Sequence, residues 1–417
     1  MGKDYIETIP RQVKDAELAS DAIDHTAISD SFIYLNSGDP AASNDTGEGY
    51  VLGSLWVNTT SGQQFICTAT TAEDATWINQ EGDDVNPPFV MQGTTYGWVA
   101  AGGTDPGGPA YYGSNNITRF SFTAPESGTA VGELSFNNQA ANNGSMRSDT
   151  LALVIGGYQS HPSAYPGHQP GSAGTVDTMD SFTFTSPSTV TDIGEYGVAV
   201  SATASTTDGT TGFVMGGDNN SSVKTDVTTR MPLTSPHPMS DNGELSAVTG
   251  QGVGLTDLTY AFRVAGSSPP SMDTVEKMAF ATTSGPFTDV GEISRATHGL
   301  GGCNGPTKGF VAGGGPPPLT ARSDMETFTF ASPFTSVDVG ELDSQRAYTF
   351  GCSSTDYGFF VGGAGPASDS VTVDTISTIP WSATSGGSTD FGELSNHTMN
   401  PSYQSYGANN MSAFESN

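Results

Sequence analysis

The sequence predicts an all-β protein whose C-terminal three-quarters forms a six-bladed β-propeller. Three segments recur six times in one order: an apolar run ending in a glycine pair, an alternating aromatic strand, and a Gly-Glu-apolar triplet. Successive glutamates of the triplet are 62, 49, 48, 49 and 52 residues apart. A period near fifty residues is a signature of repeat architectures, and four short strands per repeat are the content of a propeller blade.

Composition favours an ordered β protein rich in turns. The 417 residues include 53 glycines and 25 prolines, 35% are hydrophobic and 14% are charged. Glycine and proline together stay below the share typical of low-complexity disorder. The net charge of −31 and the lack of a basic stripe predict no nucleic-acid partner, because an anionic surface repels phosphate backbones.

Hydropathy predicts neither a membrane span nor a secretory leader. No run of 18 apolar residues occurs, and the first five residues are already polar. We therefore expect no membrane partner and assembly in a cytosol.

Residues 1–35 are expected to form an anchor or oligomerisation segment with a short helix that starts at Pro10. The apolar stripe of this helix consists of Val13, Leu18, Ala22 and Ile23, and the candidate anchor residues are Ile9, Val13, Leu18 and Ile23. Because the segment has little core of its own, we expect the stripe to pack on another protein or another copy of the chain. Ordinary core packing is the alternative.

Residues 36–82 are expected to form a small β module. Apolar residues alternate at 55–57, a Ser-Gly turn follows, alternation resumes at 65–67, and 76–78 reads as a third strand. Residues 83–88 contain two prolines and are expected to link this module to the propeller at 89–417.

Within the repeats, the aromatic strands are expected to fill the space between adjacent sheets, since their large side chains point to one face. These strands carry Phe120 and Phe122, Phe182 and Phe184, Met278 and Phe280, Phe328 and Phe330, and Ile379 and Trp381, with Met231 and Leu233 in an out-of-phase third copy. The glycine pairs are expected to allow close approach or a bulge where blades converge.

The recurring glutamates are Glu133, Glu195, Glu244, Glu292, Glu341 and Glu393. We interpret them as structural residues that close the same turn or hydrogen bond in every blade, because an active site breaks symmetry. Cys303 and Cys352 lie one repeat apart, which predicts equivalent strands of neighbouring blades. With Cys67 they are expected to be buried thiols outside any disulfide.

No catalytic, metal or cofactor site is predicted. The sequence lacks Gly-x-Ser-x-Gly, and its six histidines show no metal-ligand spacing. The carboxylates are too numerous for sequence alone to exclude a glycosidase pair.

Two loops, within 106–112 and 158–170, break the symmetry of the repeats. Tyrosine and histidine on proline-rich loops suit stacking on sugars or interface contacts. The candidate ligand-binding residues are Tyr111, Tyr112, Tyr158, His161, Tyr165 and His168. A variable surface loop, or a contact to a neighbouring subunit, is the alternative.

The repeat resembles the kelch family of propellers, whose repeats also carry an apolar run ending in Gly-Gly. It departs from that pattern because the usual Tyr and Trp at fixed distances after the glycines are missing, so the resemblance implies architecture only. The tail at 396–410 is expected to close the ring beside residues 88–97, or to start an incomplete extra blade.

The stretch from Gly53 to Cys67, Gly-x-Leu-Trp-Val-Asn-x-x-x-Gly-x-x-Phe-x-Cys, closes on Trp77 and resembles small β modules of phage tail-fibre and other virion appendage proteins. Asp-Val-Gly-Glu-Leu at 338–342 is similar to repeats in structural proteins of cyanobacterial phages. These resemblances imply a virion protein assembled in the host cytoplasm, held by its N-terminus to other tail proteins. Its propeller would adhere to a host-surface glycan or protein, and a homotrimer is favoured. The alternatives are a purely structural tail, baseplate or nozzle component, and a polysaccharide-degrading tailspike enzyme.

Overall fold

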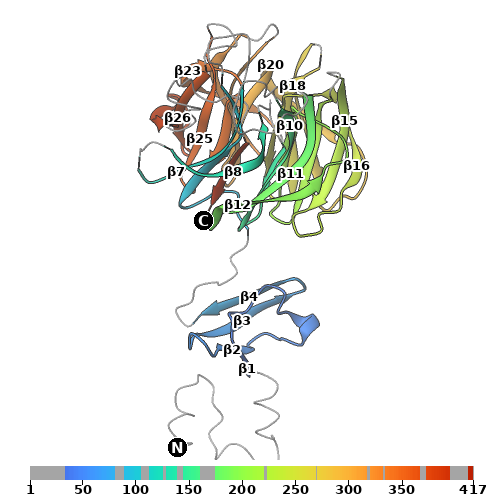
Figure 1. Cartoon of the computed structure of the whole chain (residues 1–417), viewed down its shortest axis with the longest axis vertical. Coiled ribbons are helices and arrows are strands. Elements are labelled where there is room, and N and C mark those ends of the chain that lie inside the picture. The colour runs from blue at the N-terminus through green and yellow to red at the C-terminus, as the bar shows by residue number, and fades with distance from the viewer. Residues whose placement is uncertain are drawn as a thin grey trace, which may run out of the picture. The chain divides into compact units, whose positions relative to one another are not determined.

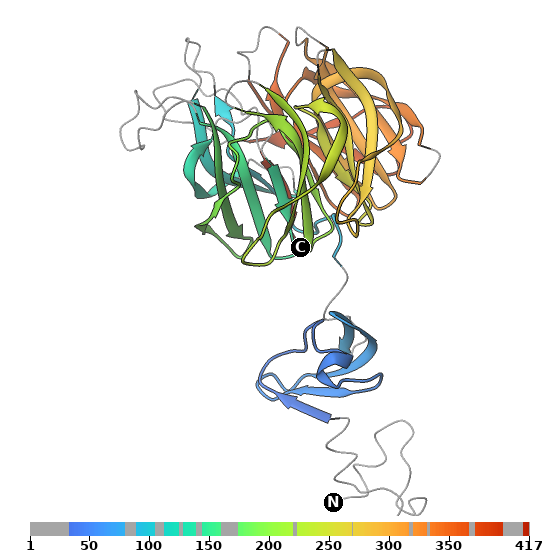
Figure 2. The ribbon, with the colours of Figure 1, turned by 90° about the vertical axis from the view of Figure 1, so that its right-hand side faces the viewer.

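The computed structural model describes residues 33–79, 89–104, 112–124, 128–138, 144–159, 174–219, 223–268, 270–316, 320–331, 334–366, 372–394 and 412–416. The chain divides into two compact units, 1–88 and 89–417 (Figure 1, Figure 2). Apart from the one-turn 3-10 helix η1 (Thr46–Glu48), every regular element in the described residues is a strand, so the protein is all-β. The expected N-terminal helix and its apolar stripe fall in residues 1–32, outside the described part.

The first unit is a four-stranded sheet in the order β1-β2-β3-β4. Its strands are β1 (Ile33–Asn36), β2 (Leu55–Asn58), β3 (Gln64–Thr71) and β4 (Asp74–Asn79). The predicted hairpin and third strand are confirmed. The parallel edge strand β1 was not predicted, and the expected boundary between residues 35 and 36 falls inside it.

One face of this sheet is covered by the chain's own loop. Trp56 and Trp77 are buried on that face and meet edge to face, with ring centroids 5.8 Å apart. Their indole nitrogens donate to the carbonyls of Gly38 at 2.8 Å and Asn44 at 3.1 Å. The segment between β1 and β2 is thus held over the tryptophans, which explains how so small a unit acquires a core.

The second unit consists of six antiparallel sheets that follow one another along the chain. The first sheet contains β28 (Ser412–Ser416), β5 (Tyr96–Ala100), β7 (Tyr112–Ser121) and β8 (Thr129–Asn138), with β6 (Gly103–Thr104) also paired to β7. The second contains β9 (Gly144–Arg147), β10 (Leu151–Gln159), β11 (Gly174–Thr183) and β12 (Ser186–Glu195). The third contains β13 (Ala204–Thr207), β14 (Thr211–Asp218), β15 (Lys224–Pro232) and β16 (Ser240–Thr249).

The fourth and fifth sheets share one long strand, β20 (Thr288–Asn304). The fourth contains β17 (Val253–Thr256), β18 (Tyr260–Ser267), β19 (Ser271–Ala279) and the first half of β20. The fifth contains the second half of β20, β21 (Lys308–Gly315), β22 (Arg322–Thr329) and β23 (Ser336–Arg346). The sixth contains β24 (Phe350–Ser353), β25 (Tyr357–Ala364), β26 (Thr372–Pro380) and β27 (Thr389–Glu393).

The first strands of the six sheets, which we call the inner strands, form a closed circle. They are β28, β9, β13, β17, the second half of β20 and β24; each contacts the next, and β24 contacts β28. The C-terminal strand β28 pairs with β5, near the start of the unit. The expected closure by the tail is therefore observed, but the strand involved is Ser412–Ser416; residues 396–410 lie outside the described part.

Side chains of the aromatic strands pack between neighbouring sheets, as predicted. Phe280 of the fourth sheet lies 5.0 Å from Phe213 of the third, measured between ring centroids. Phe330 of the fifth sheet lies 5.2 Å from Phe262 of the fourth. In the out-of-phase third sheet, Met231 and Leu233 are buried in the same role against the second. Large apolar side chains thus join each sheet to its predecessor.

The Gly-Glu-apolar triplet forms a β-bulge that fits against the next sheet. In four repeats the aspartate two residues before the glycine accepts from the glycine N–H, as at Asp241 and Gly243 (2.9 Å) and Asp338 and Gly340 (2.7 Å). The glycines have positive φ, 125° at Gly243. A Cβ there would overlap the backbone of the next sheet at Gly285. Both the positive φ and the contact with the next sheet therefore require a glycine at position 243.

The expected turn-closing role of the six glutamates is not what the structure shows. Their side chains are exposed on the fourth strands of the sheets, far from the circle of inner strands. The aspartate performs the turn closure, and the apolar residue after the glutamate, such as Leu245 or Leu342, is buried in five repeats and half-buried at Tyr196. The glutamates thus form no convergent acid site.

A hydrogen-bonded clamp also joins successive sheets. The serine after the triplet donates its backbone N–H and its hydroxyl to a buried carboxylate of the next sheet. Ser135 binds Asp180 at 2.8 and 2.7 Å, and Ser294 binds Glu326 at 2.8 and 2.5 Å. Between the fifth and sixth sheets the polarity is reversed: Ser377 donates to Asp343 at 2.7 Å. The reversed pair still joins a hydroxyl donor to a carboxylate acceptor, so the polar groups at this interface keep hydrogen-bond partners.

The three thiols are buried and outside any disulfide, as predicted. Cys303 of β20 pairs with Phe310 and Cys352 of β24 pairs with Phe359, so the two occupy the same register position in the fifth and sixth sheets, which confirms their equivalence.

We expect Asp180→Asn to alter the pH dependence of stability. Burial raises the pKa of Asp180, and the Ser135 hydrogen bonds only partly oppose this. The folded chain therefore holds this proton more tightly than the unfolded chain. The carboxyl's contribution to stability is greatest below its unfolded pKa of about 4 and is lost as pH rises through its folded pKa. In thermal unfolding at a series of pH values, the Tm difference between the native protein and the variant should fall as pH rises.

Glu195→Gln, which removes an exposed carboxylate from the same sheet, controls for the loss of one negative charge. A native-minus-variant Tm difference for Asp180→Asn that does not change with pH would contradict the assignment.

Candidate functional site

The structure leaves the sequence-predicted ligand and anchor residues largely outside its described part. Tyr111, His161, Tyr165, His168, Ile9, Val13, Leu18 and Ile23 all fall in residues that are not described. The backbones of Tyr112 and Tyr158 are described: Tyr112 begins β7, and Tyr158 lies near the end of β10. The expected grouping of these residues therefore stays a prediction.

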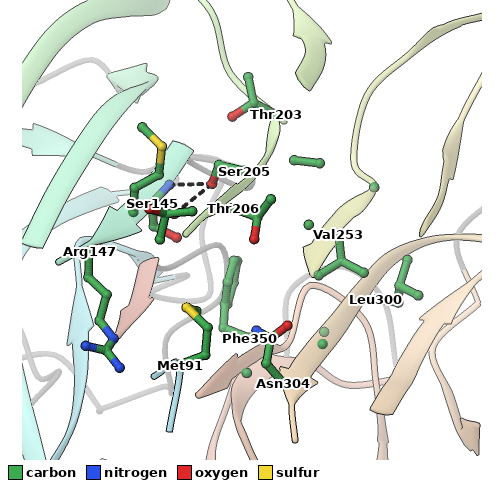
Figure 3. Close-up of a pocket in the computed structure, with 18 of the residues that line it drawn as sticks. Met91, Ser145, Arg147, Thr203, Ser205, Thr206, Val253, Leu300, Asn304 and Phe350 are labelled. Carbon is green, nitrogen blue, oxygen red and sulfur yellow. Dashed lines mark hydrogen bonds between the residues drawn. The ribbon is translucent and has the colours of Figure 1, made fainter. Parts of the chain in front are cut away.

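The inner strands surround a cavity of about 90 Å³ (Figure 3). Five inner strands contribute to its wall, and Met91 lies at its edge. Small residues recur at the second position of these strands, namely Ser145, Ser205, Gly254, Gly302 and Gly351. They bring neighbouring strands close together, since a Cβ at Gly254 would overlap the carbonyl of Ser205. This close approach narrows the space at the centre.

Polar groups of the wall are mainly bonded to one another. The Ser205 hydroxyl accepts from the Ser145 N–H at 2.7 Å and donates to the Ser145 carbonyl at 2.9 Å (Figure 3). The Asn304 side chain accepts from the Thr256 N–H at 2.7 Å, and the Asn304 N–H donates to the Ser353 hydroxyl at 2.9 Å. The side chains therefore act first as links between inner strands.

One end of the circle is crossed by residues 89–93, which we call the strap. The Arg147 guanidinium lies 4.7 Å from the centroid of the Phe89 ring and donates to the Val90 carbonyl at 2.6 Å. The Gln92 amide donates to the Asn304 carbonyl at 2.6 Å, and the Gly93 N–H donates to the Ser353 carbonyl at 2.8 Å. Arg147, Asn304 and Ser353 are at the C-terminal ends of their inner strands, so the strap covers that end.

The chemistry available in the cavity is limited. Among the lining residues, Arg147 alone is ionisable, and its guanidinium binds the strap. A glycosidase needs two carboxyl groups across the bond that it cleaves, and the described lining offers none. The volume is also well below the roughly 300–1,000 Å³ of typical ligand pockets. A few water molecules suit this space better than a sugar ring.

No group of three or more His, Cys, Asp or Glu side chains in the described residues is placed to hold a metal ion. Nor does any helix in the described residues have the length and apolarity to cross a membrane.

Sequence reasoning missed the strap and the small residues of the inner strands. A signal for the small residues was present, because five of the six inner strands have Ser or Gly at the same place. The strap left no signal, since its partners are the Arg147 side chain of the second sheet and backbone carbonyls of the fifth and sixth sheets.

Comparison with known proteins finds no matching family model and no matching curated protein. Among solved structures, this chain is similar to YjhT, with a TM-score of 0.54 and 13% sequence identity, over 73% of this chain and 99% of the other. At this identity the likeness concerns the fold alone.

We expect Arg147→Met to loosen the strap. The variant loses the hydrogen bond to Val90 and the cation–π contact with Phe89, which together should lower the unfolding free energy by about 2 kcal/mol. Limited proteolysis should then cut faster within 80–93. Arg322→Met, in an exposed ion pair of the fifth sheet, is the matched control. Unchanged cleavage in Arg147→Met would show that the strap is held by other contacts.

Proposed function

We propose that the six sheets are the blades of a kelch-like β-propeller, and that the chain is a phage virion protein that displays this propeller for adhesion to the host surface. In this proposal the chain is a tail-fibre or tail-appendage subunit assembled in the host cytoplasm. The closed circle of inner strands and the fold likeness to YjhT support the architecture. The resemblance of the first unit and of the repeat to phage structural proteins supports the virion assignment.

The observation that carries the proposal is the contrast between the two compact units. The second unit closes its circle with its own C-terminal strand. In the first unit, the sheet face opposite Trp56 and Trp77 is not covered by the described residues of that unit. The chain therefore divides into an attachment part and a display part.

The open face of the first unit carries an aliphatic patch. Strand register places Ile33, Leu55, Ile66 and Ile78 in one row across all four strands, with Leu35 and Val57 in the next. Leu35 is 71% exposed and Ile66 is 43% exposed. Exposed aliphatic patches of this kind mark protein contacts. The face supports attachment to other tail proteins or to copies of this chain, including the homotrimer favoured from the sequence.

The alternatives to adhesion are a polysaccharide-degrading enzyme and a purely structural component. A polysaccharide-degrading tailspike needs a carboxyl pair in a groove, and the described cavity has neither the groups nor the room. A purely structural tail, baseplate or nozzle component would use the propeller for contacts with other virion proteins. Adhesion is favoured over this role because the propeller needs no partner to complete its circle.

Adhesion is tested with fluorescently labelled protein and cyanobacterial cells. We expect both the full chain and a chain of residues 89–417 to bind cells, and the unlabelled shorter chain to compete with the full one. Residues 1–88 alone should not bind, because they form the attachment part. Failure of 89–417 to bind any strain that the full chain binds would move adhesion to the first unit. Binding by neither protein would favour the structural role.

A further inference from the structure

A cluster of polar residues lies at the end of the inner strands opposite the strap. Its members are Asp218 at the end of β14, Lys224 at the start of β15, Ser271 at the start of β19 and His298 in β20. Asp218 pairs with Ser201, just before the inner strand β13, and His298 begins the inner half of β20. Three consecutive sheets thus contribute to one rim.

The four residues form two bonded pairs. The Lys224 ammonium lies 2.8 and 3.0 Å from the two carboxylate oxygens of Asp218. The Ser271 hydroxyl lies 2.9 Å from Nδ1 of His298. Burial, together with the positive charge of Lys224, lowers the pKa of His298, so its ring is neutral at pH 7. Gly250 lies between the two pairs: a Cβ at Gly250 would lie 2.5 Å from a carboxylate oxygen of Asp218, and Gly250 pairs with Ser267, whose strand partner is Ser271.

The two pairs differ in their access to solvent. The side chains of Lys224 and Asp218 are 16% and 19% exposed, whereas Ser271 and His298 are each 7% exposed. The ion pair can be reached from outside, and the Ser–His pair forms its support. Within the pair, the ammonium has three hydrogens and the carboxylate about four acceptor positions, so both keep bonding capacity.

The cluster breaks the symmetry of the repeat. Strand register places Tyr158, Ser267, Gly315 and Ala364 of other sheets at the Asp218 position. Thr175, Ser271 and Thr372 occupy the Lys224 position. Among these, the third sheet alone has a charged pair. Residues that build the ring are copied from sheet to sheet, so an uncopied charged pair on the rim indicates a local role.

The chemistry of the cluster selects the kind of ligand. Asp218 and Lys224 compensate each other, and His298 is neutral, so the cluster has no net charge. The chain as a whole carries −31, which disfavours an anionic ligand. A cationic ligand would compete with Lys224 for Asp218. A neutral diol avoids both costs, because one hydroxyl donates to the carboxylate and its neighbour accepts from the ammonium.

We propose that Asp218, Lys224, Ser271 and His298 form a binding site for a neutral saccharide. Asp218 and Lys224 contact adjacent hydroxyl groups, and Ser271 holds the His298 ring beside them. This inference rests on the proposed adhesion function and names the ligand class and its site. The position equivalent to Asp218 in the second sheet is Tyr158, a residue expected from the sequence to contact sugars.

The test uses the full chain and the methyl glycosides of glucose, galactose, mannose and N-acetylglucosamine, with methyl glucuronide as the anionic comparison. Saturation-transfer NMR and titration calorimetry report binding. We expect at least one neutral glycoside to bind and to be preferred over glucuronide. Asp218→Asn and Lys224→Met should each weaken it about tenfold, since each removes a hydrogen bond to a charged group. Lys224→Arg, which keeps the charge and donors, should retain binding.

Asp324→Asn and Lys277→Met are matched controls. The first removes an acid from the fifth sheet, and the second removes a base from the fourth. Thermal unfolding identifies folded variants, and Lys224→Arg keeps the test valid if Lys224→Met unfolds. The inference is overturned if the native full chain binds none of the neutral glycosides or prefers glucuronide. It is also overturned if the Asp218→Asn variant binds the glycoside as tightly as the native chain. Cell adsorption without glycoside binding would overturn this site alone and leave adhesion through another receptor. If the native chain neither adsorbs to cells nor binds a glycoside, the proposed function is overturned as well.

Discussion

The pairing of the last strand with the first sheet is the interaction on which the second unit depends. β28 supplies the inner strand of that sheet and lies between β24 and β9 in the circle. The Ser416 hydroxyl accepts from the indole of Trp98 at 2.9 Å, and its carbonyl accepts from the N–H groups of Thr94 and Thr95. Without this strand, two inner strands would lose a neighbour. Each sheet buries its aromatic side chains only because the preceding sheet covers them, so an open circle would expose a whole interface.

The repeated devices and the unrepeated ones have separate roles. Bulge glycines with their aspartates, serine clamps and aromatic strands recur because every interface between sheets presents the same packing problem. The reversed clamp at Asp343 and Ser377 shows that the chain preserves the complementarity of the contact and not the identity of its residues. The strap and the polar rim cluster occur at the two ends of the inner strands. They are the places where the described chain departs from its own repeat.

The sequence revealed most of the fold because its signals are side chains with one structural use. Paired aromatics such as Phe328 and Phe330 can only be buried between sheets, and the period of their recurrence gives the number of sheets. Other features depend on partners that are distant in sequence. Asp180 and Glu326 look like ordinary surface acids until a serine of the preceding sheet is placed beside them. The strap binds backbone carbonyls, which have no sequence signature, and β1 pairs with a strand about twenty residues away across an irregular loop. His298 was visible as a histidine, but only the fold brings Ser271 and Lys224 to it.

The closure of the circle is tested most directly by a cross-link between its two ends. Val99 and Ala413 are direct partners in the β5–β28 register. Directly opposed residues of antiparallel strands lie within the Cα separation that a disulfide spans. With Val99→Cys and Ala413→Cys in the full chain, we predict an intramolecular disulfide under mild oxidation and a raised Tm that falls again on reduction. Formation of disulfide-linked dimers, or no disulfide in the folded protein, would show that β28 does not close its own chain.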